Sequence, residues 1–327
     1  MINLNYLLYD KSFDFQFNEK EELLTDTIIR FNEMLEYIEK ENKILSSTGD
    51  FFAYEVETGK TFFDWLFEED DTERQLVRSF IETLPTIERD AYEEALSYFK
   101  EDRNCSYNTL ICFFYCDNVF KKELNLNYTR SEILARSKTF YRDNLYNILI
   151  REEKEFINAK KFYLICVNSI TTFLKEAKVC FENLHFGLDV ETNMRNAYND
   201  NQFAETHIDK VIYQLKVLNE YGLEIINNNR NQGERRICEI IQIKGRLTGA
   251  DIFDACSPEG DADDALRLNL PFKNNSDNSQ EEKTIIRCSP HIKYYYANYH
   301  YRTYFGLPIN TIAQGTKIPI GSIGEHL

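Results

Sequence analysis

The chain has 327 residues, of which 43% are hydrophobic and 28% charged, so it can bury a sizeable core and lacks the composition of a disordered protein. Its formal net charge of −16 excludes a general attraction to nucleic-acid phosphates, so any such contact must be local. No apolar run approaches the roughly 20 residues that span a bilayer, and the first residues show no basic leader. We expect a cytoplasmic protein of two domains that does not contact membranes.

The eight cysteines are scattered, several within apolar runs, and no CxxC pair is present. In a cytosolic chain this pattern indicates reduced core residues, and we expect no metal site and no cofactor. An acidic stretch over 251–264, which includes Glu259, lacks the spacing of an EF-hand and is interpreted as a solvated loop. The alternative, a metal-dependent DNA nuclease using Asp261 and Asp263, remains open.

Residues 1–225 predict an α-rich body with a few strands. Apolar residues at spacings of three and four predict helices over 19–45, 61–67, 72–84, 87–98, 131–159, 169–184 and 204–221, the last ending at Gly222. A strand or hairpin is predicted over 2–17, and strands are predicted over 51–56 and 161–167. Residues 107–119 form either a strand or a buried helix, because periodicity does not separate the two.

Residues 226–327 predict a smaller β-rich domain, which gives an α+β fold class. A turn at 227–233 precedes a strand over 236–244, and the most polar run in the chain, 274–282, predicts an exposed loop. Four further strands are predicted over 283–288, 292–296, 301–305 and 318–323.

The last 44 residues differ in charge from the rest of the chain. Between Thr284 and Leu327 there are four basic side chains and one acid, Glu325, so this segment carries +3 and the remainder −19. Either this segment presents a basic functional face, or it is a short, mostly buried strand domain that lacks surface acids.

The same segment concentrates side chains that can bind phosphate and move protons. Three of the five histidines lie there, among lysine, arginine and tyrosine residues. On an alternating strand His291, Lys293 and Tyr295 share one face, and Arg302 and Tyr304 share a face of the next strand. Pairing of the two strands predicts one surface of cations, imidazoles and tyrosines, which suits RNA. The alternative is a small aromatic-rich sheet with polar residues at its edge.

The segment from Tyr301 to Phe305, YRTYF, followed by a turn and KIPIGSIGEHL from Lys317 to Leu327, resembles the end of a RelE/HigB-like toxin fold. In that superfamily an arginine-bearing strand precedes a final strand with a catalytic aromatic or histidine, and its members are cytoplasmic ribonucleases of toxin–antitoxin and related defence systems. The resemblance covers about 40 residues, and Ser322 stands where it implies a histidine.

These observations lead to two hypotheses. In the first, the chain is a defence- or toxin-type effector that binds RNA through its C-terminal segment and acts as a metal-independent ribonuclease. Its catalytic residues are then Arg302, Lys293, His326 and His291, its substrate-binding residues are Tyr304, Tyr295 and Lys317, and the Arg302 head is exposed to solvent. In the second, the chain is a non-catalytic sensor or adaptor subunit of an antiviral defence complex, whose acidic body binds a protein partner.

Overall fold

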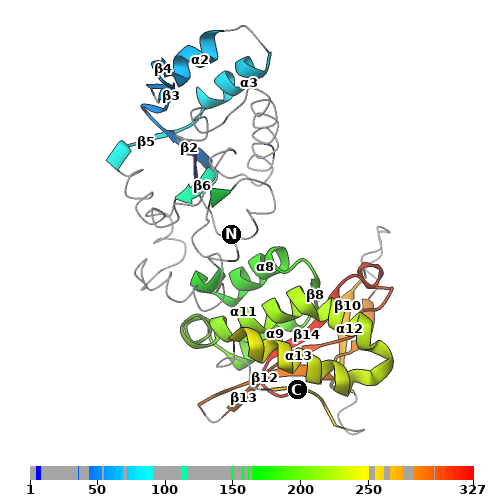
Figure 1. The fold of residues 1–327 in the computed structure, drawn as a ribbon. Coiled ribbons are helices and arrows are strands. Elements are labelled where there is room, and N and C mark those ends of the chain that lie inside the picture. Colours follow the sequence, from blue (N-terminus) through cyan, green and yellow to red (C-terminus); the bar gives the residue numbers. More distant parts are fainter. Residues whose placement is uncertain are drawn as a thin grey trace. The chain divides into compact units, whose positions relative to one another are not determined.

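A computed structural model shows the fold of part of the chain (Figure 1). The residues that it describes are 5–8, 36, 44–53, 55–68, 72–90, 112–115, 149–150, 157, 161, 164–249, 255–260, 266–274, 283–297 and 299–327. They belong to two compact units, one formed by described residues between 5 and 157 and the other by residues from 161 to 327.

The N-terminal unit contains a mixed five-stranded sheet in the order β5–β2–β1–β6–β7. The strands are β1 (Asn5–Leu8), β2 (Ile44–Thr48), β5 (Thr86–Ile87), β6 (Cys112–Tyr115) and β7 (Leu149–Ile150). β1 pairs parallel with β2 and antiparallel with β6. Of the range 107–119, for which a strand and a buried helix were both possible, the structure describes only Cys112–Tyr115, and these residues form a strand.

Two helices of this unit, α2 (Phe62–Glu68) and α3 (Thr72–Ile81), match the predictions for 61–67 and 72–84, and α2 follows a small hairpin of β3 (Glu55–Glu57) and β4 (Lys60–Thr61). Thr61 and Asp64 form a reciprocal cap at the start of α2. The Thr61 backbone N–H donates to Asp64 Oδ2 at 2.9 Å, and the Asp64 N–H donates to Thr61 Oγ1 at 3.2 Å. These bonds satisfy two donors that the first helical turn would otherwise leave unpaired.

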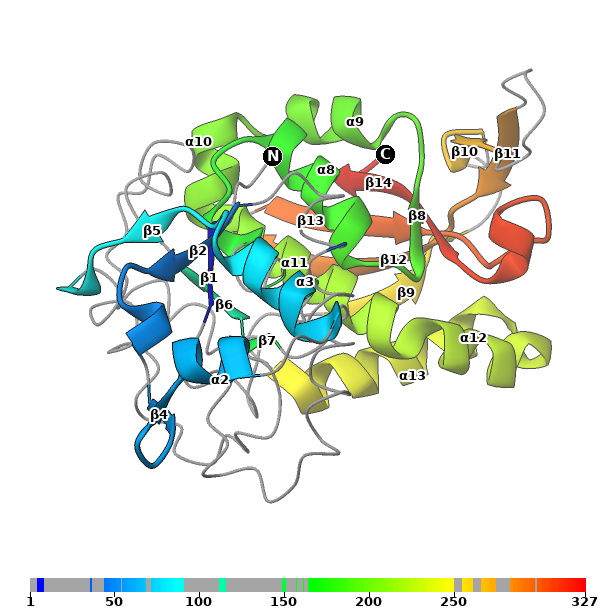
Figure 2. The same ribbon diagram turned by 90° about the horizontal axis from the view of Figure 1, so that it is seen from above.

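The C-terminal unit contains a second five-stranded sheet in the order β8–β14–β13–β12–β9 (Figures 1 and 2). Its strands are β8 (Leu184–Phe186), β9 (Ala255–Pro258), β12 (Pro290–Tyr296), β13 (Tyr299–Phe305) and β14 (Ile318–Gly324). β8 is parallel to β14 and all other pairs are antiparallel. The fold is therefore α+β, and three of the predicted C-terminal strands are confirmed as β12, β13 and β14.

Helices cover one face of this sheet. They are α8 (Ile170–Cys180), α9 (Val190–Ala197), α10 (Asp200–Gln202), α11 (Ile208–Val217), α12 (Leu223–Asn229) and α13 (Gly233–Gly249). The Thr303 hydroxyl donates to Gln214 Oε1 at 2.6 Å, which ties β13 to α11. The buried side chains of Ile292 and Phe305 also belong to the inner faces of these strands.

The helical segment does not end at Gly222, contrary to the prediction. Residues Phe203–His207 and Leu218–Gly222 form π-helical turns that join α10, α11 and α12 into one run. A Cβ at Gly222 would lie 2.5 Å from Ile318 Cδ1, so this glycine allows the helix to approach β14 closely. The run reverses only at Gly233, where φ is +83°, a conformation that favours glycine.

The predicted strand over 236–244 is wrong, because these residues belong to helix α13. Ile237, Ile241 and Gly245 are buried at a spacing of four, which is the period of one helical face. Tyr213 donates a 2.7 Å hydrogen bond to the Gly245 carbonyl and so connects α11 to α13. The predicted domain boundary at 225–226 falls inside α12, within the C-terminal unit.

A hairpin of β10 (Asn269–Lys273) and β11 (Lys283–Arg287) packs beside the ends of the larger sheet (Figure 2). Phe272, Ile286 and Cys288 form a buried apolar cluster with Tyr304. A β-bulge in β14 places Gly321 against this cluster, where an added Cβ would lie 2.6 Å from Cys288 Sγ. The hairpin thus covers part of the sheet face opposite the helices.

Other predictions have mixed outcomes. The strand at 283–288 is confirmed as β11, and the helix at 169–184 begins after its cap Ser169 but ends at Cys180. The strand at 161–167 is wrong, since Leu164–Cys166 forms a 3-10 turn. The helices at 19–45, 87–98 and 131–159 and the loop at 274–282 lie largely outside the described residues. None of the described helices is both long enough and apolar enough to cross a membrane.

Candidate functional site

The register of β12 and β13 brings most of the predicted site residues onto one surface. We call the sheet face opposite the helices the open face, although the β10–β11 hairpin covers its end at Tyr304. Cross-strand neighbours share a face and lie close together. The three pairs on the open face are His291 with Tyr304, Lys293 with Arg302, and Tyr295 with His300.

Glu259 connects several of these side chains, although the sequence assigned it to a solvated loop. Its Oε1 accepts a 2.9 Å hydrogen bond from the Tyr304 hydroxyl and lies 3.6 Å from His291 Nδ1, 3.7 Å from Arg302 Nε and 3.4 Å from His326 Nε2. We call these five residues the Glu259 cluster. The Glu259 side chain is only 16% exposed, so its interpretation as part of a solvated loop is wrong.

The cluster fixes the ionisation of its members. Burial opposes the charge on Glu259, but the Tyr304 hydrogen bond and the nearby His291, His326 and Arg302 outweigh it and lower the Glu259 pKa. Burial lowers the pKa of His291 to about 4, since its contact with Ser289 and the attraction of Glu259 offset only part of the desolvation. At neutral pH the carboxylate is therefore ionised and His291 is neutral.

The His291 side chain is fully buried, so it presents no atom to solvent. Its Nδ1 lies 3.2 Å from the Ser289 carbonyl, which accepts, and its Nε2 lies 3.4 Å from Ser257 Oγ. Burial and the Glu259 bond raise the pKa of Tyr304, so its hydroxyl remains protonated. These contacts hold Glu259 in place from the interior of the sheet.

Ser322 lies opposite Tyr304 in the β13–β14 ladder. Among the described residues its hydroxyl oxygen has no hydrogen-bond partner, and the same is true of Ser289 Oγ and Arg302 Nε. Buried polar atoms are normally paired, so these three are exceptions to the usual pattern. The position that the toxin resemblance assigns to a histidine is thus a buried hydroxyl beside the Glu259 cluster.

Two predicted site residues differ from their expected setting. The Arg302 side chain is 12% exposed, so the expectation of a solvent-exposed head is wrong, because Glu259 draws it against the sheet. Lys317 precedes the first residue of β14, whereas His326 follows the last, and an extended strand of this length spans about 20 Å. The structure therefore does not bring Lys317 into the Glu259 cluster.

The exposed member of the cluster is His326, whose side chain is 44% exposed. Its Nδ1 lies 2.7 Å from the Leu327 carbonyl, and its Nε2 faces Glu259. An imidazole oriented by a carboxylate can transfer protons, and an adjacent guanidinium and ammonium can hold a phosphate. Within the described part of the chain, no group of three or more His, Cys, Asp or Glu side chains is arranged to hold a metal ion.

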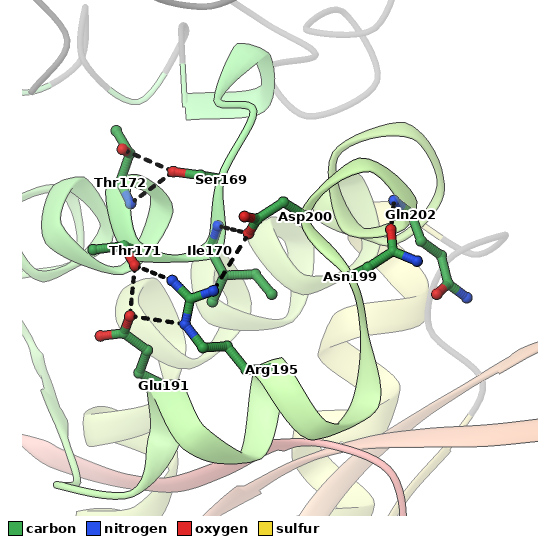
Figure 3. Close-up of polar contacts among 9 residues, drawn as sticks. All are labelled: Ser169, Ile170, Thr171, Thr172, Glu191, Arg195, Asn199, Asp200 and Gln202. Carbon is green, nitrogen blue, oxygen red and sulfur yellow. Dashed lines mark hydrogen bonds and ion pairs between the residues drawn. The ribbon is translucent and has the colours of Figure 1, made fainter.

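A second polar cluster joins α8, α9 and α10 (Figure 3). The Arg195 guanidinium hydrogen-bonds to Thr171 and Glu191 and lies 4.0 Å from Asp200 Oδ1. Asp200 Oδ1 also accepts a 2.8 Å bond from the Ile170 N–H at the start of α8. Each charged group has an opposite charge beside it, and Asp200 caps the start of α8. The cluster therefore has the features of a structural contact that holds α8, α9 and α10 together.

His207 is surrounded by tyrosines on the helix side of the sheet. Its ring centroid lies 4.7 Å from that of Tyr301 and 4.8 Å from that of Tyr198. Its Nδ1 is 3.2 Å from the Tyr294 hydroxyl, which in turn lies 2.9 Å from the Tyr198 hydroxyl. The side chain is fully buried, and desolvation, with Lys210 nearby, lowers its pKa to about 4. The tyrosines around His207 come from segments distant in sequence, so no local pattern brings them together.

Comparisons with models of protein families, with curated proteins and with solved structures found no match to this chain.

Proposed function

We propose that this chain is an RNA-binding effector of the defence or toxin type, and that the open face of its C-terminal sheet cleaves RNA without a metal ion. The observation that carries this proposal is the convergence of His326, Arg302 and Tyr304 on one Glu259 carboxylate oxygen, next to Lys293. The resemblance of this segment to RelE/HigB-like toxins supports the same assignment.

The chemistry follows from the exposure of each group. His326 donates through Nε2 to Glu259, and its Nδ1, once it leaves the Leu327 carbonyl, accepts the proton of the ribose 2′-hydroxyl. The 2′-oxygen then attacks the phosphorus while the bond from phosphorus to the 5′-oxygen breaks. Glu259 orients the imidazole. Arg302 and Lys293 stabilise the charge that develops on the phosphate oxygens, and Lys293 donates to the departing 5′-oxygen. The products are a 2′,3′-cyclic phosphate and a free 5′-hydroxyl.

The test compares growth and total RNA after induced expression of the wild type, His326→Ala, Lys293→Ala and the control Lys317→Ala. We expect growth arrest and RNA cleavage for the wild type and for Lys317→Ala. RNA cleavage by purified His326→Ala should be about 100-fold slower, a typical loss for an acid–base group. Arg302→Ala is a poorer test, because it leaves the partly buried Glu259 without its arginine and so affects folding.

The wild-type thermal unfolding midpoint must be retained by each variant for its activity to be interpreted. Equal cleavage by the wild type and His326→Ala would contradict the role of the Glu259 cluster in catalysis. So would an equal loss of cleavage in Lys317→Ala, since that residue lies at the other end of β14.

A second candidate is a non-catalytic sensor or adaptor subunit of a defence complex. One reason is that Glu259 already faces both Arg302 and His326, so the charged groups of the cluster pair with each other. The other is the −19 charge of the chain outside its last 44 residues. In that case wild-type expression leaves growth and RNA intact, and the cluster only anchors the C-terminal residues.

A further inference from the structure

The open face presents its side chains in rows that change in chemistry along β12 and β13. The row nearest the turn between β12 and β13 is Tyr295 with His300, and the next is Lys293 with Arg302. The third row contains His291 and Tyr304 of the Glu259 cluster. Because residues two apart on a strand point the same way, successive rows lie about 7 Å apart. An aromatic pair, a cationic pair and the acid–base cluster thus follow one another.

The side chains of the first row are exposed to solvent. The Tyr295 side chain is 50% exposed, His300 is exposed, and the two ring centroids lie 4.9 Å apart. Exposed aromatic faces beside cationic side chains are the usual means of binding unpaired nucleobases, since every base has a flat face and its strand carries phosphates. Charge complementarity with the Lys293–Arg302 row therefore indicates a nucleic-acid strand.

We infer that the ligand of the open face is single-stranded RNA, with an unpaired base stacked on Tyr295 and His300 and the adjoining phosphate held by Lys293 and Arg302. This inference rests on the proposed function and specifies its substrate. Bases within a duplex are stacked on each other and cannot lie on a side-chain ring, so a duplex occupies only the cationic row. The order of the rows then carries the strand from Tyr295 towards Glu259.

Two neighbouring tyrosines of β12 and β13 provide a matched control. Tyr296 and Tyr299 are directly opposite each other in the ladder and point to the helix side of the sheet. The Tyr296 ring lies 5.0 Å from that of His207 and 5.0 Å from Lys210 Nζ. Tyr299 is 63% exposed, more than Tyr295, yet it faces away from the cationic row.

The experiment measures binding of a fluorescein-labelled 12-nucleotide RNA to the full chain by anisotropy, as a single strand and as a duplex with its complement. The parent protein is His326→Ala, which prevents cleavage. Tyr295→Ala, Tyr295→Phe and Tyr299→Ala are each added to this parent. We expect the single strand to bind more tightly than the duplex, and Tyr295→Ala to weaken single-strand binding about tenfold, a typical effect of removing one stacking ring. Tyr295→Phe and Tyr299→Ala should bind within about twofold of the parent.

Equal weakening by Tyr295→Ala and Tyr299→Ala, tighter binding of the duplex, or no binding of either RNA would overturn the inference. Cleavage is measured separately in proteins that retain His326, which distinguishes the two proposals. If binding depends on Tyr295 but no RNA is cleaved, the single-strand site is supported and the ribonuclease proposal is refuted. If RNA is cleaved equally well with and without Tyr295, the ribonuclease proposal is supported and the single-strand site is refuted.

Discussion

Glu259 has two opposed effects on the candidate site. As a carboxylate it reduces the positive charge that Arg302 offers to a phosphate, 3.7 Å away. As an acceptor it fixes His326, Tyr304 and His291 around one oxygen. Replacing it would leave Arg302 largely buried without a counter-charge, which is among the more destabilising single changes. The residue therefore favours precise placement of the site over strong electrostatic attraction.

His207 gives the prediction at this scale, through the pH dependence of stability. Its pKa falls from 6.5 to about 4 on folding, so the unfolded chain binds its proton more readily. Its contribution to the free energy of unfolding is fully present above the unfolded pKa and is lost as pH falls through the folded pKa. The loss amounts to about 2 kcal/mol by about pH 5. His207→Phe removes this titration, so the loss of stability between about pH 8 and pH 5 should be smaller than in the wild type by that amount.

Urea denaturation followed by circular dichroism at the two pH values provides the measurement. His291 also titrates with a pKa lowered to about 4 and remains in the variant, so part of the acid sensitivity should persist. If the stability of His207→Phe depended on pH as that of the wild type does, the pKa of His207 would be the same in the folded and unfolded states.

Single residues also show what the sequence could not reveal. Strand alternation placed His291, Lys293 and Tyr295 on one face, because the side-chain period of a strand is two. Glu259 was missed since its bond to Tyr304 joins residues 45 apart in sequence, and no local pattern encodes such a contact. The solvent exposure of Arg302 was predicted wrongly for the same reason, because it depends on Glu259.

At the scale of elements, local pattern predicted the strands β12, β13 and β14 and failed for a helix that packs on the sheet. The segment 236–244 is rich in isoleucine, whose β-branched side chain favours strands, but burial at a spacing of four in α13 overrides that preference. Gly222 likewise has the local appearance of a helix end and instead makes room for Ile318.

The contact between Gly222 and Ile318 gives the prediction at this scale. An exposed helical Gly→Ala change usually stabilises by about 1 kcal/mol. Here the added methyl would lie 2.5 Å from Ile318 Cδ1 in a fully buried setting, so Gly222→Ala should destabilise by roughly 1–3 kcal/mol. Ile318→Val removes that carbon atom. In the Ile318→Val background, Gly222→Ala should therefore cost less than in the wild type.

A double-mutant cycle of urea denaturation measures the coupling between the two positions. Additive effects would show that the helix shifts to accept the methyl and that close approach to β14 does not require glycine. A favourable coupling would establish that the π-helical turn at Leu218–Gly222 is held against the sheet by this contact.

At the scale of the whole molecule, the charge distribution separates the site from the rest of the chain. The last 44 residues carry +3 and the remainder −19, so the net charge of the remainder opposes the approach of RNA. A protein of this kind gains little from non-specific phosphate contacts. The proposed RNA binding therefore depends mainly on stacking and on the few cations of the open face.

The salt dependence of RNA binding tests this directly. Each phosphate neutralised on a single strand contributes about −0.7 to the slope of log K against log salt. Lys293 contributes one contact, and Arg302, which Glu259 partly neutralises, contributes at most another, so we expect a slope between about −0.7 and −1.4. Anisotropy titrations over a range of potassium chloride concentrations measure it. Lys293→Gln should make the slope shallower by about 0.7, and Lys317→Gln should leave it unchanged. A slope of about −4 or steeper would require more phosphate contacts than Lys293 and Arg302 provide, and would place the RNA on another surface.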